Sequence, residues 1–217
     1  MSAAEVLIQG CDTLPKLFLK VSAERGDRIA MREKDFGIWQ AYTWADYRER
    51  AFEIAWGLLS LGLERGDVVS IQSEDCREWL WADVGAMLAG GVVNGIYPTY
   101  QSRQVEHTLI DSNCRFLFAE DEEQLDKYLE IEEQLPHIER VFVFDWTGLR
   151  DFEHDKVAPF DALLAMGLEY GMDNPGVIER IAEEGSGDDL AALVYTSGTT
   201  GMPKGAMLQQ RYIMFQM

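Results

Sequence analysis

One short segment of the sequence combines hydroxyl groups, glycines and a lysine in a spacing that could bind phosphate. Residues 195–205 read YTSGTTGMPKG. The glycines permit backbone conformations that other residues resist, so successive amide groups can turn toward an anion. The hydroxyl groups add donors without charge, and Lys204 adds a compact cation suited to a flexible polyphosphate. The residues expected to contact phosphate are Thr196, Ser197, Gly198, Thr199, Thr200, Gly201 and Lys204.

An ordinary surface turn is the alternative interpretation of this segment, since glycine, serine and threonine are common loop residues. Phosphate binding is favoured because four hydroxyl groups and a lysine follow directly after the apolar run 190–195 (LAALVY). The spacing excludes a Walker A loop, which needs GxxxxGK followed by serine or threonine. Here Lys204 follows Pro203 and precedes Gly205.

The elements around this segment predict an α/β fold, a layered parallel sheet flanked by helices. The run 190–195 is predicted to be a buried core strand, and ligands usually bind at the carboxyl ends of such strands. Upstream, short β-branched runs alternate with helical patterns, which is typical of βαβ units. The predicted strands cover 67–73, 92–96, 116–119 and 141–144, and the predicted helices cover 76–89, 102–110 and 122–134.

Turn and capping residues predict further local structure. A hairpin of 28–33 and 39–42 is expected around Asp35-Phe36-Gly37, followed by a helix that Thr43 caps and that reaches about Leu61. Asp75 is expected to cap the helix 76–89, with Glu78 completing a capping box. Residues 146–189 are predicted to be a surface connection with helices at 160–170 and 175–184, and 183–189 a flexible approach to the strand.

Composition and charge narrow the classes of partner. With 217 residues, 47% hydrophobic and 26% charged, the chain is long enough for a substantial core. Its formal charge of -19 repels phosphate backbones at long range, so nucleic acid is not an expected partner. The longest weakly polar stretch, 84–93, is too short to cross a bilayer, so no transmembrane segment is expected. No secretory leader is recognised, which favours a cytoplasmic protein.

The cysteines and histidines do not predict a metal site. Their spacing matches neither a paired disulfide framework nor a set of zinc ligands. A reducing cytosol is favoured, and no metal is assigned to protein ligands. The residues concerned are Cys11, Cys76, Cys114, His107, His137 and His154. The tryptophans Trp39, Trp56, Trp79 and Trp81 are expected to lie in the core rather than to contact a ligand, and Tyr97, Pro98 and Tyr100 are expected to pack rather than to line a pocket.

The segment 195–205 resembles the signature of the adenylate-forming superfamily of acyl-CoA synthetases, luciferases and peptide-synthetase adenylation domains, which is close to YTSGTTGxPKG. The resemblance extends to the helix start at Thr43, to 62–67 (GLERGD) and to 90–99 (GGVVNGIYPT). Within the superfamily, 32–44 (REKDFGIWQAYTW) and 95–109 (GIYPTYQSRQVEHTL) are most similar to long-chain fatty acyl-CoA synthetases.

The resemblance implies ATP-dependent activation of a carboxylic acid to an acyl-adenylate, with release of pyrophosphate, and then transfer to CoA with release of AMP. ATP, Mg²⁺ and CoA are the implied cofactors, and a long-chain fatty acid is the implied substrate. The loop matching Thr196 to Lys204 would hold the β and γ phosphates. Relatives often continue with a His and an Asn, whereas this chain reads LQQRY at 208–212, so no role is carried over to those positions.

We expect residues 1–217 to form the N-terminal part of the large AMP-binding domain, with 190–210 as the strand and phosphate-binding loop. The catalytic residues are expected beyond Met217, together with the rest of that domain and a small C-terminal domain. The chain alone is therefore expected to be inactive and to be part of a longer protein. Dimerisation could cover an unfinished sheet edge, and peripheral membrane association stays open.

Two alternative functions remain at this point. The first is an ATP-binding module without catalysis. The second keeps adenylation but transfers the acyl group to an acceptor other than CoA. The segments 32–44 and 95–109 count against the second alternative.

Overall fold

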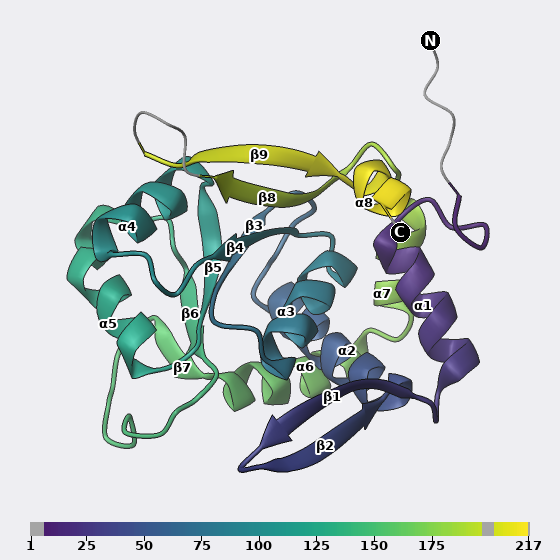
Figure 1. Ribbon diagram of the computed structural model, residues 1–217, viewed down its shortest axis with the longest axis horizontal. Coiled ribbons are helices and arrows are strands. Elements are labelled where there is room, and N and C mark those ends of the chain that lie inside the picture. Colours follow the sequence, from purple (N-terminus) through teal and green to yellow (C-terminus); the bar gives the residue numbers. More distant parts are fainter. Residues whose placement is uncertain (1–6, 197–201, 217) are drawn as a thin grey trace.

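The computed structural model describes residues 7–196 and 202–216, and within them one seven-stranded sheet spans the molecule (Figure 1). Its strand order is β7-β6-β5-β3-β4-β8-β9. All neighbouring strands are parallel except β8 and β9, which are antiparallel. The predicted α/β fold is confirmed. The strands are β3 (Val68–Gln72), β4 (Val92–Ile96), β5 (Cys114–Ala119), β6 (Arg140–Val143), β7 (Val157–Pro159), β8 (Leu190–Thr196) and β9 (Lys204–Gln209).

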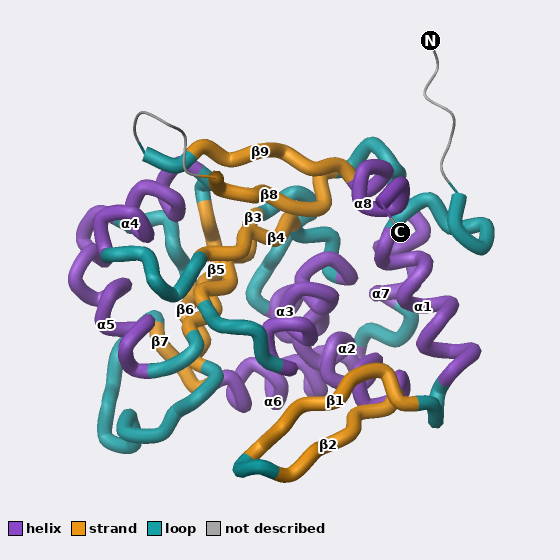
Figure 2. The backbone as a smooth tube through the Cα atoms, viewed as in Figure 1, coloured by secondary structure: helices purple, strands orange, loops and turns teal. Residues whose placement is uncertain are grey.

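Helices cover both faces of this sheet, so the strands carry apolar residues on both sides (Figure 2). In β3, Val69 and Ile71 face one core and Val68 faces the other. The second core lies under α4 (Ser102–Asp111) and α5 (Glu122–Ile131), which continues as the 3-10 turn η1 (Glu132–Gln134). The first, larger core lies under α1 (Leu14–Arg25), α2 (Trp44–Ser60), α3 (Arg77–Leu88), α6 (Phe160–Asp173) and α7 (Val177–Glu184).

The predicted hairpin and the helix after it are confirmed. Strands β1 (Ile29–Asp35) and β2 (Ile38–Thr43) pair antiparallel around Phe36 and Gly37, which both have positive φ angles. Two such residues suit a tight turn between twisted strands. Thr43 caps α2 in a capping box with Asp46, whose carboxylate accepts a hydrogen bond from the Thr43 amide.

Two predictions about individual side chains are wrong. Cys76, not Asp75, caps α3: its Sγ accepts a hydrogen bond from the Trp79 amide. Trp39 is not in a core, since 65% of its surface is exposed to solvent. It lies on β2, which forms a two-stranded sheet with β1. A two-stranded hairpin has too few neighbours to cover both of its faces. Trp81, in contrast, is buried against the sheet as predicted.

Residues 146–189 are part of the fold rather than a surface connection. Leu163 and Ile178, in α6 and α7, are fully buried in the larger core. α6 packs so closely on α2 that a Cβ at Gly167 would lie 1.9 Å from the Glu53 carbonyl oxygen. Of the predicted flexible approach at 183–189, the first two residues end α7, and 186–189 form a turn in which the Asp189 carboxylate accepts from the Ser186 amide and from Arg65.

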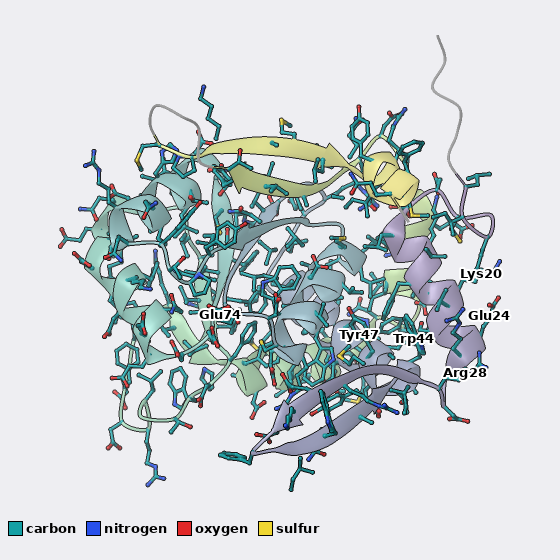
Figure 3. All side chains as sticks on the ribbon, in the orientation of Figure 1. Lys20, Glu24, Arg28, Trp44, Tyr47 and Glu74 are labelled. Atoms are coloured by element: carbon teal, nitrogen blue, oxygen red, sulfur yellow. The ribbon has the colours of Figure 1, made fainter. Side chains whose placement is uncertain are left out.

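The aromatic residues at the start of α2 join the hairpin side of the molecule to α1. Trp44 and Tyr47 (Figure 3) stack with ring centroids 6.1 Å apart. The Tyr47 ring lies edge-on to Phe18 of α1, with ring centroids 4.9 Å apart. The Tyr47 hydroxyl donates to the Leu80 carbonyl oxygen in α3. These contacts fix three helices against one another near the amino end of α2.

Asp83, a partly buried carboxyl group in α3, is expected to make the stability of the chain depend on pH. Burial raises the pKa of Asp83 from its ordinary value of 3.8 to about 7. Since the folded pKa lies above the unfolded one, the contribution of this group is fully present below about pH 4 and is lost as the pH rises through 7. We expect Asp83→Asn to stabilise the chain by roughly 2 kcal/mol at pH 8 and to give no gain at pH 4.

Urea unfolding of both proteins at the two pH values checks this prediction. Asp75→Asn, an exposed position just before the same helix, is the control for loss of one negative charge. An equal gain at pH 4 and pH 8, or an equal pH-dependent gain in Asp75→Asn, would contradict a role for burial of Asp83.

Candidate functional site

The candidate site lies at the edge of the sheet where the parallel strands end. β8 runs parallel to β4, with Val194 opposite Gly95, so Thr196 lies beyond the end of β4. The helices that follow β3 and β4, which are α3 and α4, cover opposite faces of the sheet. Such a change of face leaves a crevice at the carboxyl ends of the strands, where α/β proteins usually bind ligands.

β8 is less buried than the sequence predicted. Ala191 and Tyr195 are buried, but Val194 is 41% exposed. The physical reason is the position of β8 in the sheet: its second neighbour is β9, an antiparallel edge strand, rather than another core strand. β9 was not predicted from the sequence, and its residue Met207 is 63% exposed.

β8 and β9 bring the two ends of the segment 195–205 together. Thr196 pairs with Lys204, and Tyr195 pairs with Gly205. Gly205 is required here by close approach, because a Cβ at this position would lie 2.9 Å from the Tyr195 ring. The ladder therefore places the Thr196 hydroxyl group and the Lys204 ammonium group at one end of a single strand pair.

Helix α4 contacts the same two chain segments (Figure 1). The Tyr195 hydroxyl donates to Asp111 Oδ2 at 2.7 Å, and His107 Nε2 lies 2.8 Å from the Pro203 carbonyl oxygen. Burial, and then the nearby Asp111 carboxylate, raise the pKa of the Tyr195 hydroxyl, which therefore stays protonated and donates this hydrogen bond.

Sequence reasoning did not find these two residues of α4. From the sequence, His107 was considered only as a metal ligand and was not assigned as one, and Asp111 was not singled out. Their spacing of four residues on one helix was the available signal, but nothing in the local sequence connects that helix to residues 195–205.

Two of the seven predicted phosphate contacts can be placed. Thr196 and Lys204 are both exposed, at the paired ends of β8 and β9. None of the ion pairs formed among the described residues includes Lys204. The other five predicted contacts lie outside the described residues; they are Ser197, Gly198, Thr199, Thr200 and Gly201.

Residues 7–196 and 202–216 contain neither a candidate metal site nor a candidate membrane span. No cluster of three or more His, Cys, Asp or Glu residues there could hold a metal ion. No helix in that part of the chain is both long enough and apolar enough to cross a membrane. The three cysteines are free thiols, and Cys11 and Cys114 are buried.

The sheet and the segment at the end of β8 are those of an AMP-binding enzyme. That family, described as "AMP-binding enzyme", matches residues 18–217, and the chain belongs to it. The predicted resemblance to the adenylate-forming superfamily is thereby confirmed.

Among curated proteins, the chain is similar to long-chain-fatty-acid–CoA ligases. It is 32% identical over 198 residues to ACSBG1 of Bos taurus, a match that covers 91% of this chain and 27% of that protein. It is 30% identical over 209 residues to heimdall of Drosophila melanogaster, covering 94% of this chain and 30% of that protein. The chain thus spans less than a third of the length of these relatives.

Solved structures agree with the fold. The anthranilate CoA ligase AuaEII superposes with a TM-score of 0.76 at 22% identity, covering 92% of this chain and 35% of that one. Acetoacetyl-CoA synthetase from Streptomyces lividans gives a TM-score of 0.77 at 22% identity, covering 93% and 31%. At this identity the likeness concerns the fold and not the substrate.

Proposed function

We propose that this chain supplies the phosphate-binding part of an AMP-forming acid–CoA ligase that activates long-chain fatty acids. In this proposal residues 1–217 are the N-terminal part of the large AMP-binding domain, and 190–210 form its strand and phosphate-binding loop. The observation that carries the proposal is the pairing of Thr196 with Lys204 at the carboxyl end of β8, in a chain that belongs to the AMP-binding enzyme family.

The described residues fit the polyphosphate of ATP. An exposed hydroxyl group and an exposed ammonium group lie at the same end of one strand pair, and a lysine can serve several phosphate oxygens as a point charge. The site is local, since the chain as a whole carries a formal charge of -19. A nucleotide would therefore be recognised by contacts at the end of β8 rather than by long-range attraction.

The chemistry of adenylation explains why such a site is useful. A substrate carboxylate attacks the α-phosphate of ATP, a new C–O–P linkage forms, and the bond to the β-phosphate breaks to release pyrophosphate. Charge develops on the leaving pyrophosphate, and positioned donors stabilise it without a protein nucleophile. Lys204 and the hydroxyl groups of 196–200 would supply these donors. Mg²⁺, when bound, would neutralise part of the phosphate charge.

Long-chain fatty acids are proposed as the substrates because the similar curated proteins carry that name and the similarity covers nine-tenths of this chain. The second half-reaction, transfer to CoA, is proposed on the same ground. The other residues that would perform both steps are proposed to lie beyond Met217.

Acid-dependent exchange of labelled pyrophosphate into ATP tests the proposal. The full-length protein that contains this chain would be assayed with acids from acetate to long-chain and aromatic acids, and residues 1–217 alone would be the comparison. We expect exchange that is greatest with long-chain acids and absent from the isolated chain. ATP binding without exchange for any acid would instead indicate an ATP-binding module without catalysis.

A second assay separates the acceptors. Acyl-CoA formation would be measured with the best acid from the exchange experiment. Exchange without thioester formation would indicate that another acceptor replaces CoA.

A further inference from the structure

Helix α4 holds both ends of the segment that carries Lys204. Tyr195, which directly precedes Thr196, donates a hydrogen bond from its hydroxyl group to Asp111. His107 contacts the carbonyl group of Pro203, which directly precedes Lys204. A carbonyl oxygen can only accept, so Nε2 of His107 carries the hydrogen in this contact. Since His107 and Asp111 are four residues apart, one face of one helix makes both contacts.

One of the two contacts lies just beyond the strand ladder, at Pro203, and the other lies at Tyr195, in the last pair but one of the ladder. The pairing of β8 and β9 ends with Thr196 and Lys204. Pro203 lies outside that ladder, and its nitrogen has no hydrogen to donate. His107 therefore fixes the peptide group that directly precedes Lys204. On the other strand, the buried Tyr195 ring packs over Gly205, and its hydroxyl group reaches Asp111.

α4 is itself held firmly on the sheet, so it can serve as a fixed reference for these contacts. Val105 and Leu109 are fully buried in the core beneath it. The Thr108 side chain is buried as well and donates to the Gln104 carbonyl oxygen. Val105 and Leu109 alternate with His107 and Asp111, so the helix packs with one face and contacts the β8–β9 end with another.

We propose that His107 and Asp111 are positioning residues for Lys204. α4 fixes the direction in which the Lys204 ammonium group meets a polyphosphate, and neither side chain needs to touch the ligand. This inference rests on the proposed function, because the polyphosphate is the ligand that the exchange reaction requires. It predicts that both residues affect the use of pyrophosphate more than they affect folding.

Kinetic variants of the full-length protein test this proposal. His107→Ala and Asp111→Ala are each expected to raise the KM for pyrophosphate in the exchange reaction by roughly tenfold, the effect of one displaced charged contact. The urea unfolding midpoint should change little. His107→Gln keeps a donor and Asp111→Asn keeps an acceptor, so these variants should recover most of the wild-type KM.

His137→Ala is the matched control. His137 Nε2 lies 3.2 Å from the Leu109 carbonyl oxygen, so this histidine also contacts α4 through a backbone group, away from Pro203. If the His107→Ala effect came only from loosening of α4, His137→Ala should raise the KM for pyrophosphate by a similar amount. A KM for pyrophosphate that stays at the wild-type value in His137→Ala and rises in His107→Ala supports positioning.

Tyr195→Phe covers the case in which Asp111→Ala does not fold. It removes only the hydroxyl group and keeps the ring over Gly205, and it should reproduce the effect of losing Asp111. If the wild-type protein exchanges pyrophosphate and these variants match His137→Ala, the inference is overturned and the proposed function stands. If the wild-type protein shows no exchange with any acid, the proposed function fails and this inference fails with it.

Discussion

Lys204→Ala is expected to slow acid-dependent pyrophosphate exchange by about a hundredfold or more, the range found when one group that stabilises developing charge is removed. Lys204 is exposed at the first position of β9, and in the described part of the chain no carboxylate pairs with it. Its removal should therefore leave the free energy of unfolding within about 0.5 kcal/mol of wild type. Exchange kinetics and urea unfolding measure the two quantities.

The controls for this experiment separate charge from geometry. Lys204→Arg keeps the charge but changes its shape, and should retain part of the activity. Lys20→Ala removes an exposed lysine of α1 that donates a hydrogen bond to the Gln9 carbonyl oxygen, far from the end of β8 (Figure 3), and should leave exchange unchanged. A large loss of stability in Lys204→Ala, with normal activity per folded molecule, would show that Lys204 has a structural role.

Gly167→Ala is expected to destabilise the chain by roughly 3 kcal/mol or more, the upper range for overpacking of a core. α2 and α6 approach so closely that the added Cβ would lie 1.9 Å from the Glu53 carbonyl oxygen and 3.0 Å from the Gly57 amide nitrogen. Both of those atoms belong to the backbone of α2, so relief would require the two helices to separate. Alanine favours an isolated helix by about 1 kcal/mol over glycine, which is too little to offset this.

Urea unfolding of Gly167→Ala measures the effect. Glu169→Ala, at an exposed position of the same helix, is the control for a change of helix propensity and should alter stability by less than about 0.5 kcal/mol. A Gly167→Ala protein as stable as wild type would mean that the α2–α6 contact is looser than the structure shows.

Several elements could be predicted from the sequence because their signals are local. The hairpin turn depends on Phe36 and Gly37, and the start of α2 depends on Thr43 and Asp46 three residues later. Short apolar runs and helical patterns likewise predicted β3 to β6 and the helices between them. These signals fall within one turn or one strand, where backbone conformation and the nearest side chains dominate.

Other features could not be predicted, since they depend on neighbours distant in sequence. β9 forms because it completes a pair with β8 at the sheet edge. The close packing of α6 on α2 at Gly167 depends on the path of a helix more than a hundred residues earlier in the chain. A run of apolar residues predicts that a segment is buried, but it does not predict which element covers the segment.

The candidate site shows the same division. The sequence by itself predicted a phosphate-binding role for 195–205, because the hydroxyl groups, glycines and lysine that favour it all lie within that segment. Only the tertiary structure brought Asp111 to Tyr195 across 84 positions and His107 to Pro203 across 96. The physical reason is that α4 is held on the sheet by its buried face, and the packing of that face determines where its polar side chains meet the ends of β8 and β9.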